Sequence, residues 1–521
     1  MPDSANLVWL VPLFPTLAAA WIGLTYVFAN NRGEKGERQT ALIAQGAALL
    51  SLLLVLIIDF ASLWQGATPG QIRLAEWFSS GDYTIHISFT LDTLGLVMMT
   101  LVAVISLITL RFSVNYLHRE AGFQRFFMIL SLLMSAMLLI VTGGSAAMVF
   151  VGWEIAGVSS YLLISYSLDR PTATSNATRA FVTNRIGDAG FILGLFLALY
   201  WVGDLEWPTL LVSTTQLPIL ATGLLGMGFL IAAMAKSGQA PFAPWIARAL
   251  EGPTPSSAVF YGSLMVHAGV YLVIRLQPVF EQVPLLMTLL ALIGLTTALY
   301  GYLVSLVQTD VKSILMFSTT SQVGLMFLTC GLGLFELATV HLVIHAIWRA
   351  YQFLSSPAHM HLMSRPTRPA PEWLVKQRWL YTAALNRFWL DPLGDWLLTR
   401  PTQALARETQ TFNERVILPL VGLPARTNAV TSLVEWESRK RGFSRLAEGD
   451  VGHGEGIAGK LMESIASMLH WFEEHLILKG GGEGLVNAIQ RVGGQLQKIE
   501  ELLGHPRYLL LLLMATFAVI I

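Results

Sequence analysis

Two ionisable residues lie inside apolar stretches of the chain and could carry a proton together. Glu154 lies well inside one stretch, and Lys236 near the end of another is followed by Pro241 and Pro244. Proline removes a backbone donor and clashes with the preceding turn, so we expect the helix to break just after Lys236. Broken helices at membrane depth line cavities that hold water or ions, and poor solvation of an amine there favours release of its proton.

We therefore interpret Lys236 as a proton carrier. Glu154 is either the acid that holds this amine charged in one state, or a carboxylate neutralised by another neighbouring cation.

A second group consists of His341, His345 and Arg349, whose spacing of four residues places all three on one helical face. Histidine titrates near physiological pH and can relay protons. A lone membrane histidine is more often a packing residue, but an aligned pair beside an arginine favours a relay. A zinc site is the weaker alternative because no carboxylate or thiol stands nearby in the sequence.

Four more polar residues complete the candidate set. Arg185 and Asp188, three residues apart on one face, are interpreted as an ion pair. His267 is a further member of the predicted proton pathway. Lys312 either marks a membrane interface or joins the relay.

The sequence contains no Walker loop, no dinucleotide fingerprint and no cysteine set for an iron–sulfur cluster or haem. Its single cysteine, Cys330, can form no internal disulfide. We expect no catalytic site in this chain, no cofactor and no bound metal.

These residues must be positioned by membrane helices. Hydrophobic residues make up 54% of the 521-residue chain and charged residues 13%, so lipid is its natural solvent. The 33 basic and 33 acidic residues cancel, which removes the electrostatic case for a nucleic-acid partner. Apolar windows of roughly 20 residues, long enough to cross a bilayer, recur near 7–29, 41–65, 89–112, 126–142, 146–166, 180–202, 218–237, 255–276, 284–306, 311–331 and 335–356. The sequence thus predicts an all-α polytopic membrane protein with about 11 to 12 transmembrane helices.

Positively charged connections indicate orientation, because Lys and Arg resist translocation. The connections after the first, third, fifth and seventh windows carry them, at Arg32, Lys35, Arg38, Arg119, Arg125, Arg170, Arg179 and Arg248. The N-terminus is therefore predicted outside a cell inner membrane. We predict a transmembrane domain over 1–360, amphipathic helices on the cytoplasmic side over 361–506, and a final span or anchor over 507–521.

Several motifs resemble the L subunit of respiratory complex I and the A subunit of Mrp antiporters, over roughly residues 90–356. They are Gly152-Trp153-Glu154, Arg185-Ile186-Gly187-Asp188, Ala235-Lys236-Ser237, Glu251-Gly252-Pro253-Thr254-Pro255-Ser256 and Gln308-Thr309-Asp310-Val311-Lys312. The resemblance implies a proton half-channel formed by Glu154 and Lys236, which His341 and His345 continue towards the centre with Lys312 as a further relay member.

Two departures from that family stand out. The family's lysine after the second histidine is replaced by Arg349, which stays protonated and cannot carry a proton. No second broken span with its own lysine or glutamate follows before residue 360, so the outward exit looks incomplete.

These features lead to several functional hypotheses. The first is a proton-conducting subunit that resembles the membrane half of DAB-type inorganic-carbon uptake complexes, where a larger, zinc-containing, carbonic-anhydrase-like partner docks on the cytoplasmic side. The second is a proton-translocating subunit of a complex I-like NADH-quinone oxidoreductase, whose partners are other respiratory subunits. An Mrp-type cation/proton antiporter subunit and a membrane scaffold with vestigial charges are the remaining alternatives.

Overall fold

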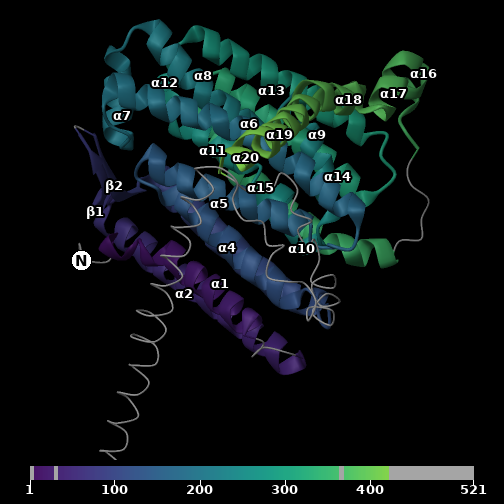
Figure 1. Cartoon of the computed structure of the whole chain (residues 1–521), viewed down its shortest axis with the longest axis horizontal. Helices are drawn as coiled ribbons and strands as arrows, with labels where there is room; N and C mark the ends of the chain where they lie inside the picture. Colours follow the sequence, from purple (N-terminus) through teal and green to yellow (C-terminus); the bar gives the residue numbers. More distant parts are fainter. Residues whose placement is uncertain (1–4, 29–32, 82, 363–368, 422–521) are drawn as a thin grey trace, which may run out of the picture. The chain divides into compact units, whose positions relative to one another are not determined.

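The computed structural model describes residues 5–28, 33–81, 83–362 and 369–421 (Figure 1). Within them, ten helical segments are long and apolar enough to cross a membrane: Ala5–Val27, Gly33–Gln65, Thr93–Tyr116, Phe123–Thr142, Ala146–Ile164, Pro171–Val202, Ile219–Lys236, Thr254–Arg275, Pro284–Ser305 and Val311–Gly331. Each overlaps one of the first ten predicted windows, although some begin or end several residues away from the predicted bounds. The eleventh window lies inside α15 (Phe335–Leu362), whose 28 residues are also long enough to cross. The predicted polytopic helical architecture is confirmed.

Close contact between backbones holds neighbouring helices together. Helix α1 (Leu10–Val27) runs beside α2 (Gly33–Gln65) and α4 (Phe123–Thr142), as Figure 1 shows. Helices α13 (Pro284–Ser305) and α14 (Val311–Gly331) meet at glycines, because a methyl group on Gly294 would lie 2.3 Å from the backbone nitrogen of Leu328. Small residues permit such approach where lipid offers helices no hydrophobic driving force.

A β-hairpin between the second and third spans was not predicted. Strands β1 (Gly70–Ser80) and β2 (Tyr83–Leu91) pair antiparallel, with Gly70 opposite Leu91 and Ser80 opposite Tyr83. Strand β2 is rich in β-branched and aromatic residues, which favour strands. The predicted window 89–112 therefore began too early, because α3 (Thr93–Tyr116) starts only after Asp92, whose side chain accepts a hydrogen bond from the Gly95 amide at 2.8 Å.

The predicted break after Lys236 is confirmed. Helix α8 (Ile219–Lys236) ends at this residue, and the short helix α9 (Pro244–Arg248) follows. Gly238 turns the chain with φ +57°, and a Cβ there would lie 1.9 Å from Cδ1 of Ile246. The Trp245 indole donates to the carbonyl of Ala235 at 2.7 Å, so a carbonyl freed at the helix end is satisfied.

The next span is also interrupted, although a continuous window was predicted at 255–276. It consists of α10 (Thr254–Ser257), a π-helical turn over Ala258–Ser263 and α11 (His267–Arg275). π-helical turns inside helices often occur at functional sites. Here the turn places His267 at the start of α11.

Shorter elements follow the membrane helices. They are α16 (Glu372–Lys376), α17 (Arg378–Leu385), a 3-10 turn over Arg387–Trp389, α18 (Leu390–Gly394), a π-helical turn over Asp395–Thr399 and α19 (Arg400–Phe412). The segment 390–399 is tied to the membrane helices by two ion pairs, Arg248–Asp391 at 2.8 Å and Arg179–Asp395 at 3.2 Å.

Contacts divide the chain into Met1–Thr402 and Gln403–Ile521. In the second unit the structure describes the rest of α19, a π-helical turn over Asn413–Ile417 and α20 (Leu418–Val421). The predicted domain boundaries at 360 and 506 stay predictions. The predicted span at 507–521 lies outside the described residues.

Candidate functional site

Arg185 stands between two carboxylates at the junction of α5 (Ala146–Ile164) and α6 (Pro171–Val202). Its guanidinium pairs with Glu154 through Nη1 and with Asp188 through Nη2, the latter at 2.8 Å. The Asp188 side chain is only 4% exposed, whereas those of Arg185 and Glu154 are 32% and 28% exposed. The residues predicted as a separate ion pair and the predicted acid are thus one network.

Lys236 is the most deeply buried cation of this network, at 1% exposure. Its Nζ donates to the carbonyl of Trp153 at 3.1 Å and lies 4.9 Å from the centre of the Trp153 ring. The same indole donates through Nε1 to Asp188 Oδ1 at 2.7 Å. Trp153 therefore contacts both the amine and a carboxylate, which is a role that the sequence reasoning missed.

Gly157 provides the space in which the two cations approach α5. A Cβ at this position would lie 2.8 Å from Arg185 Nη2 and 3.6 Å from Lys236 Nζ. Gly187 lets α6 approach α8, since a Cβ at this position would lie 2.2 Å from the Cβ of Ala235. Glu154, Asp188, Arg185 and Lys236 are thus gathered at one point where three helices meet.

The predicted histidines form a second cluster on α15 and α11. His267 and His345 are joined by a hydrogen bond of 3.0 Å between Nε2 of the first and Nδ1 of the second, and both are buried. Arg349 donates from Nε to His345 Nε2 at 3.4 Å and from Nη2 to Ser318 at 3.0 Å. His341 contacts Gln322 instead, at 2.9 Å. The π-helical turn made His267 hard to place from the sequence.

Ser237 connects the two clusters. Its hydroxyl donates to the carbonyl of Val266 at 2.6 Å, so the residue after Lys236 contacts the residue before His267. Sequence reasoning missed this contact because it depends on the breaks in two different spans.

Lys312 is the predicted residue that the structure does not join to either cluster. It lies in the first turn of α14 beside Asp310, whose side chain accepts from the Ser313 amide at 2.9 Å. Among residues 5–421 that the structure describes, Lys312 makes no ion pair. Nor does the described part of the chain contain a group of three or more histidine, cysteine or acidic side chains arranged to hold a metal ion.

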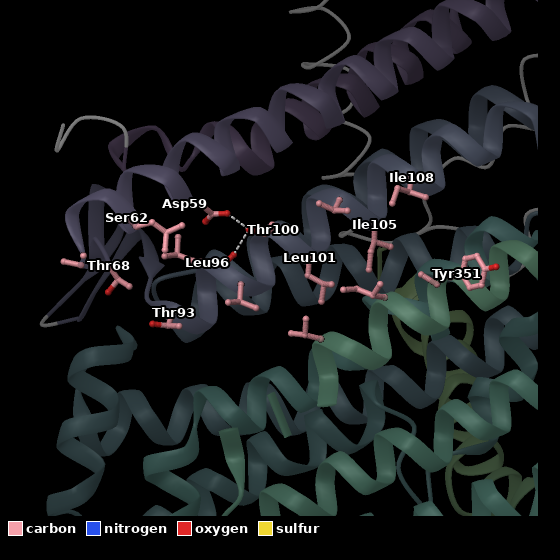
Figure 2. Close-up of a pocket in the computed structure, with 18 of the residues that line it drawn as sticks. Asp59, Ser62, Thr68, Thr93, Leu96, Thr100, Leu101, Ile105, Ile108 and Tyr351 are labelled. Carbon is pink, nitrogen blue, oxygen red and sulfur yellow. Dashed lines mark hydrogen bonds between the residues drawn. The ribbon is translucent and has the colours of Figure 1, made fainter. Parts of the chain in front are cut away.

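A groove of about 890 Å³ lies apart from these clusters, between α2, α3 and α15 (Figure 2). Figure 2 shows Asp59 and Thr100 pointing towards one another near one end, joined at 2.5 Å, and Ile108 and Tyr351 near the other. The α15 residues that line it, such as Ile347, are not those that carry the histidine cluster. Its long apolar wall is typical of a surface that contacts lipid.

Comparison with known proteins identifies the relatives of this arrangement. Residues 143–368 match the family profile described as "NADH:quinone oxidoreductase/Mrp antiporter, TM", and residues 77–127 match that of "NADH-Ubiquinone oxidoreductase (complex I), chain 5 N-terminus". These ranges include every residue of the two clusters.

Curated relatives include NAD(P)H-quinone oxidoreductase subunit 5, chloroplastic, of Marchantia polymorpha, 35% identical over 68% of this chain and 52% of the relative. Chain 5 of the same enzyme from Picosynechococcus sp. is 36% identical over 68% of this chain and 54% of the relative. The chain thus spans about half the length of these relatives.

Two solved structures share the fold. The Mrp complex from Dietzia sp. superposes with a TM-score of 0.57 and 25% identity, over 66% of this chain and 37% of that one. The archaeal membrane-bound sulfane sulfur reductase gives a TM-score of 0.57 at 21% identity, over 68% of this chain and 70% of that one. Taken with the two profiles, these relatives show that the chain belongs to the family of multi-pass membrane subunits shared by complex I-type quinone oxidoreductases and Mrp antiporters.

Proposed function

We propose that this chain is a proton-conducting subunit of a multi-subunit membrane complex. The observation that carries the proposal is Lys236, an almost fully buried amine at a broken helix end, with Arg185 and two carboxylates close by. A buried charge is expensive, and ionisable residues inside membrane proteins usually mark ion pathways. A structural ion pair alone would not require a lysine at a break.

The contacts suggest how the amine is used. Charged Lys236 is stabilised by the Trp153 carbonyl and ring face, both of which favour the ammonium form. Arg185 competes for the nearby carboxylates, since it already pairs with Glu154 and Asp188. A shift of Arg185 towards or away from them would change the negative charge that Lys236 experiences, and with it the ease of proton release.

The proposal also concerns the subunits with which this chain associates. Curated relatives named as quinone oxidoreductase subunits favour the complex I-like hypothesis over the inorganic-carbon hypothesis. We therefore propose other subunits of a quinone oxidoreductase-type complex as partners and the cell inner membrane as the location, with the N-terminus outside. Affinity purification through this chain separates the hypotheses: quinone-reductase subunits would support ours, whereas a zinc-containing, carbonic-anhydrase-like partner would support carbon uptake.

The conduction proposal is tested with Lys236→Met in the purified native complex, reconstituted in vesicles that contain a pH-sensitive dye. Methionine keeps most of the length of the side chain and removes the amine. The matched control is Lys376→Met on α16, where the side chain is 77% exposed. We expect the first variant to reduce proton flux to the leak of empty vesicles and the control to retain it. Full flux through a complex that contains Lys236→Met would overturn the proposal.

A further inference from the structure

The histidine cluster has a hydrogen-bond direction that the arginine imposes. A guanidinium has five N–H donors and no acceptor, and it stays protonated in proteins. The 3.4 Å contact from Arg349 Nε to His345 Nε2 therefore requires a lone pair on His345 Nε2. A neutral imidazole carries its single N–H on the other nitrogen, so His345 must be protonated at Nδ1.

The tautomer of His345 determines that of His267. His345 Nδ1 lies 3.0 Å from His267 Nε2, which must accept because the first nitrogen donates. The hydrogen of neutral His267 is then on Nδ1. That nitrogen is buried and has no hydrogen-bond partner among the residues that the structure describes.

We infer that Arg349 is a positioning residue that fixes both His345 and His267 in the Nδ1–H tautomer and closes the pair to a further proton. The inference rests on the proposed proton conduction.

The occupied lone pairs of His345 and His267 limit proton transfer through the pair. The pair has two lone pairs, one occupied by Arg349 and one by the N–H of His345. A proton that enters the pair must therefore bind His345 Nε2, which the Nε–H of Arg349 occupies. Arg349 cannot supply that proton, and its Nε–H must first move away.

Among the described residues, Arg349 is the group that donates a hydrogen bond to His345 Nε2. His341 is the other titratable group near His345, but their ring centres are 6.0 Å apart and His341 bonds to Gln322. Tyr261, on the adjacent π-helical turn, donates its hydroxyl to the carbonyl of Ile246 at 2.6 Å. The second anchor of Arg349 is the Ser318 hydroxyl, which holds Nη2 rather than Nε.

His341 provides an internal comparison. Its Nε2 contacts the carbonyl oxygen of Gln322 at 2.9 Å, so this ring should carry its hydrogen on Nε2. Two histidines on the same helical face are therefore predicted to have opposite tautomers, and only His345 depends on Arg349.

The test is nitrogen NMR of the complete complex in lipid, with ¹⁵N-labelled histidine at a pH where imidazole is neutral. Signals are assigned by single replacement of His267, His341 and His345 with glutamine. We expect Nδ1–H signals for His267 and His345 and an Nε2–H signal for His341. An Nε2–H signal assigned to His345 in the wild-type complex would overturn the inference, even if no Arg349 variant can be purified.

Variants then test the cause. Arg349→Gln should move His345 towards the Nε2–H form, because an amide can accept as well as donate, and Arg349→Lys should restore Nδ1–H. The control Arg111→Gln, at an exposed position of α3, should leave every histidine signal in place. An unchanged His345 in Arg349→Gln would show that the arginine does not set the tautomer. These signals do not depend on proton flux, so loss of the proposed function would appear separately in the vesicle assay.

Discussion

Replacement of the two carboxylates that share Arg185 should have unequal effects. Asp188→Asn and Glu154→Gln each remove one negative charge and keep the shape of the side chain. Asp188 is 4% exposed, pairs with Arg185 at 2.8 Å and accepts from the Trp153 indole at 2.7 Å. Glu154 pairs with the same guanidinium but is 28% exposed.

The difference in exposure determines how far each replacement should lower the free energy of unfolding. Breaking a buried charged contact typically costs about 3–5 kcal/mol. Arg185 is itself one-third exposed and keeps Glu154 as a partner, so we expect about 1.5–3 kcal/mol for Asp188→Asn, the range of a hydrogen bond to a charged group. Water can replace much of the contact that Glu154→Gln loses, so its cost should be about 1 kcal/mol or less.

The assay is equilibrium unfolding of the purified protein in mixed micelles, with both variants and the wild type titrated under identical conditions. We expect a lower midpoint for Asp188→Asn than for Glu154→Gln, and a double variant that is destabilised by more than the sum of the two, because it leaves the shared guanidinium of Arg185 with neither carboxylate. If Glu154→Gln were the more damaging change, Asp188 would not be the main neutralising group at the junction.

Three further changes test other parts of the structure. Gly157→Ala should lower proton flux, because its methyl group would lie 2.8 Å from Arg185 Nη2 and must displace the guanidinium. Gly46→Ala, with no atom within 4 Å, should leave the flux unchanged in the same vesicle assay. Burial raises the pKa of the Glu206 carboxyl above its ordinary value of 4.5, against the opposing effect of its hydrogen bond from a serine. The folded form therefore binds more protons than the unfolded form above pH 4.5, so the stability that this carboxyl contributes is fully present below that pH and is lost as the pH rises through the raised pKa. Glutamine is neutral at every pH, like the protonated carboxyl, so the difference in free energy of unfolding between wild type and Glu206→Gln should be smallest in acid and grow as the pH rises. A difference that does not change with pH would contradict this. Asp391→Asn should weaken the ion pair that ties segment 390–399 to the membrane helices by about 0.2–1 kcal/mol, seen as faster limited proteolysis of that segment, and equal cleavage in both proteins would show that the ion pair contributes nothing.

Sequence patterns predicted the helices well, because the length of an apolar stretch and the position of a proline determine a helix and its break without contacts from distant residues. The break after Lys236 follows from Pro241 and Pro244 alone, and the structure places it there. The hairpin was missed because β2 merges with the apolar start of the next window, and hydropathy does not distinguish a short strand from a helix end. The π-helical turn before His267 leaves no comparable signal.

The candidate site was harder to predict than the fold, because its contacts join different helices. Residues on one helix were grouped correctly by spacing, as with His345 and Arg349. Spacing does not reveal that Arg185 reaches Glu154 as well as Asp188, or that Trp153 lies against Lys236. Such contacts depend on close helix packing at glycines, whose partners the sequence does not name.

The two ion pairs of segment 390–399 have a mechanical consequence. Arg179 belongs to α6, the helix of Arg185 and Asp188, and Arg248 ends α9, the helix that resumes after the break at Lys236. A neighbouring subunit that pulled on this segment would transmit the load to both sides of the buried amine at once. The geometry around Lys236 would then respond to a load on segment 390–399 through α6 and α9 themselves.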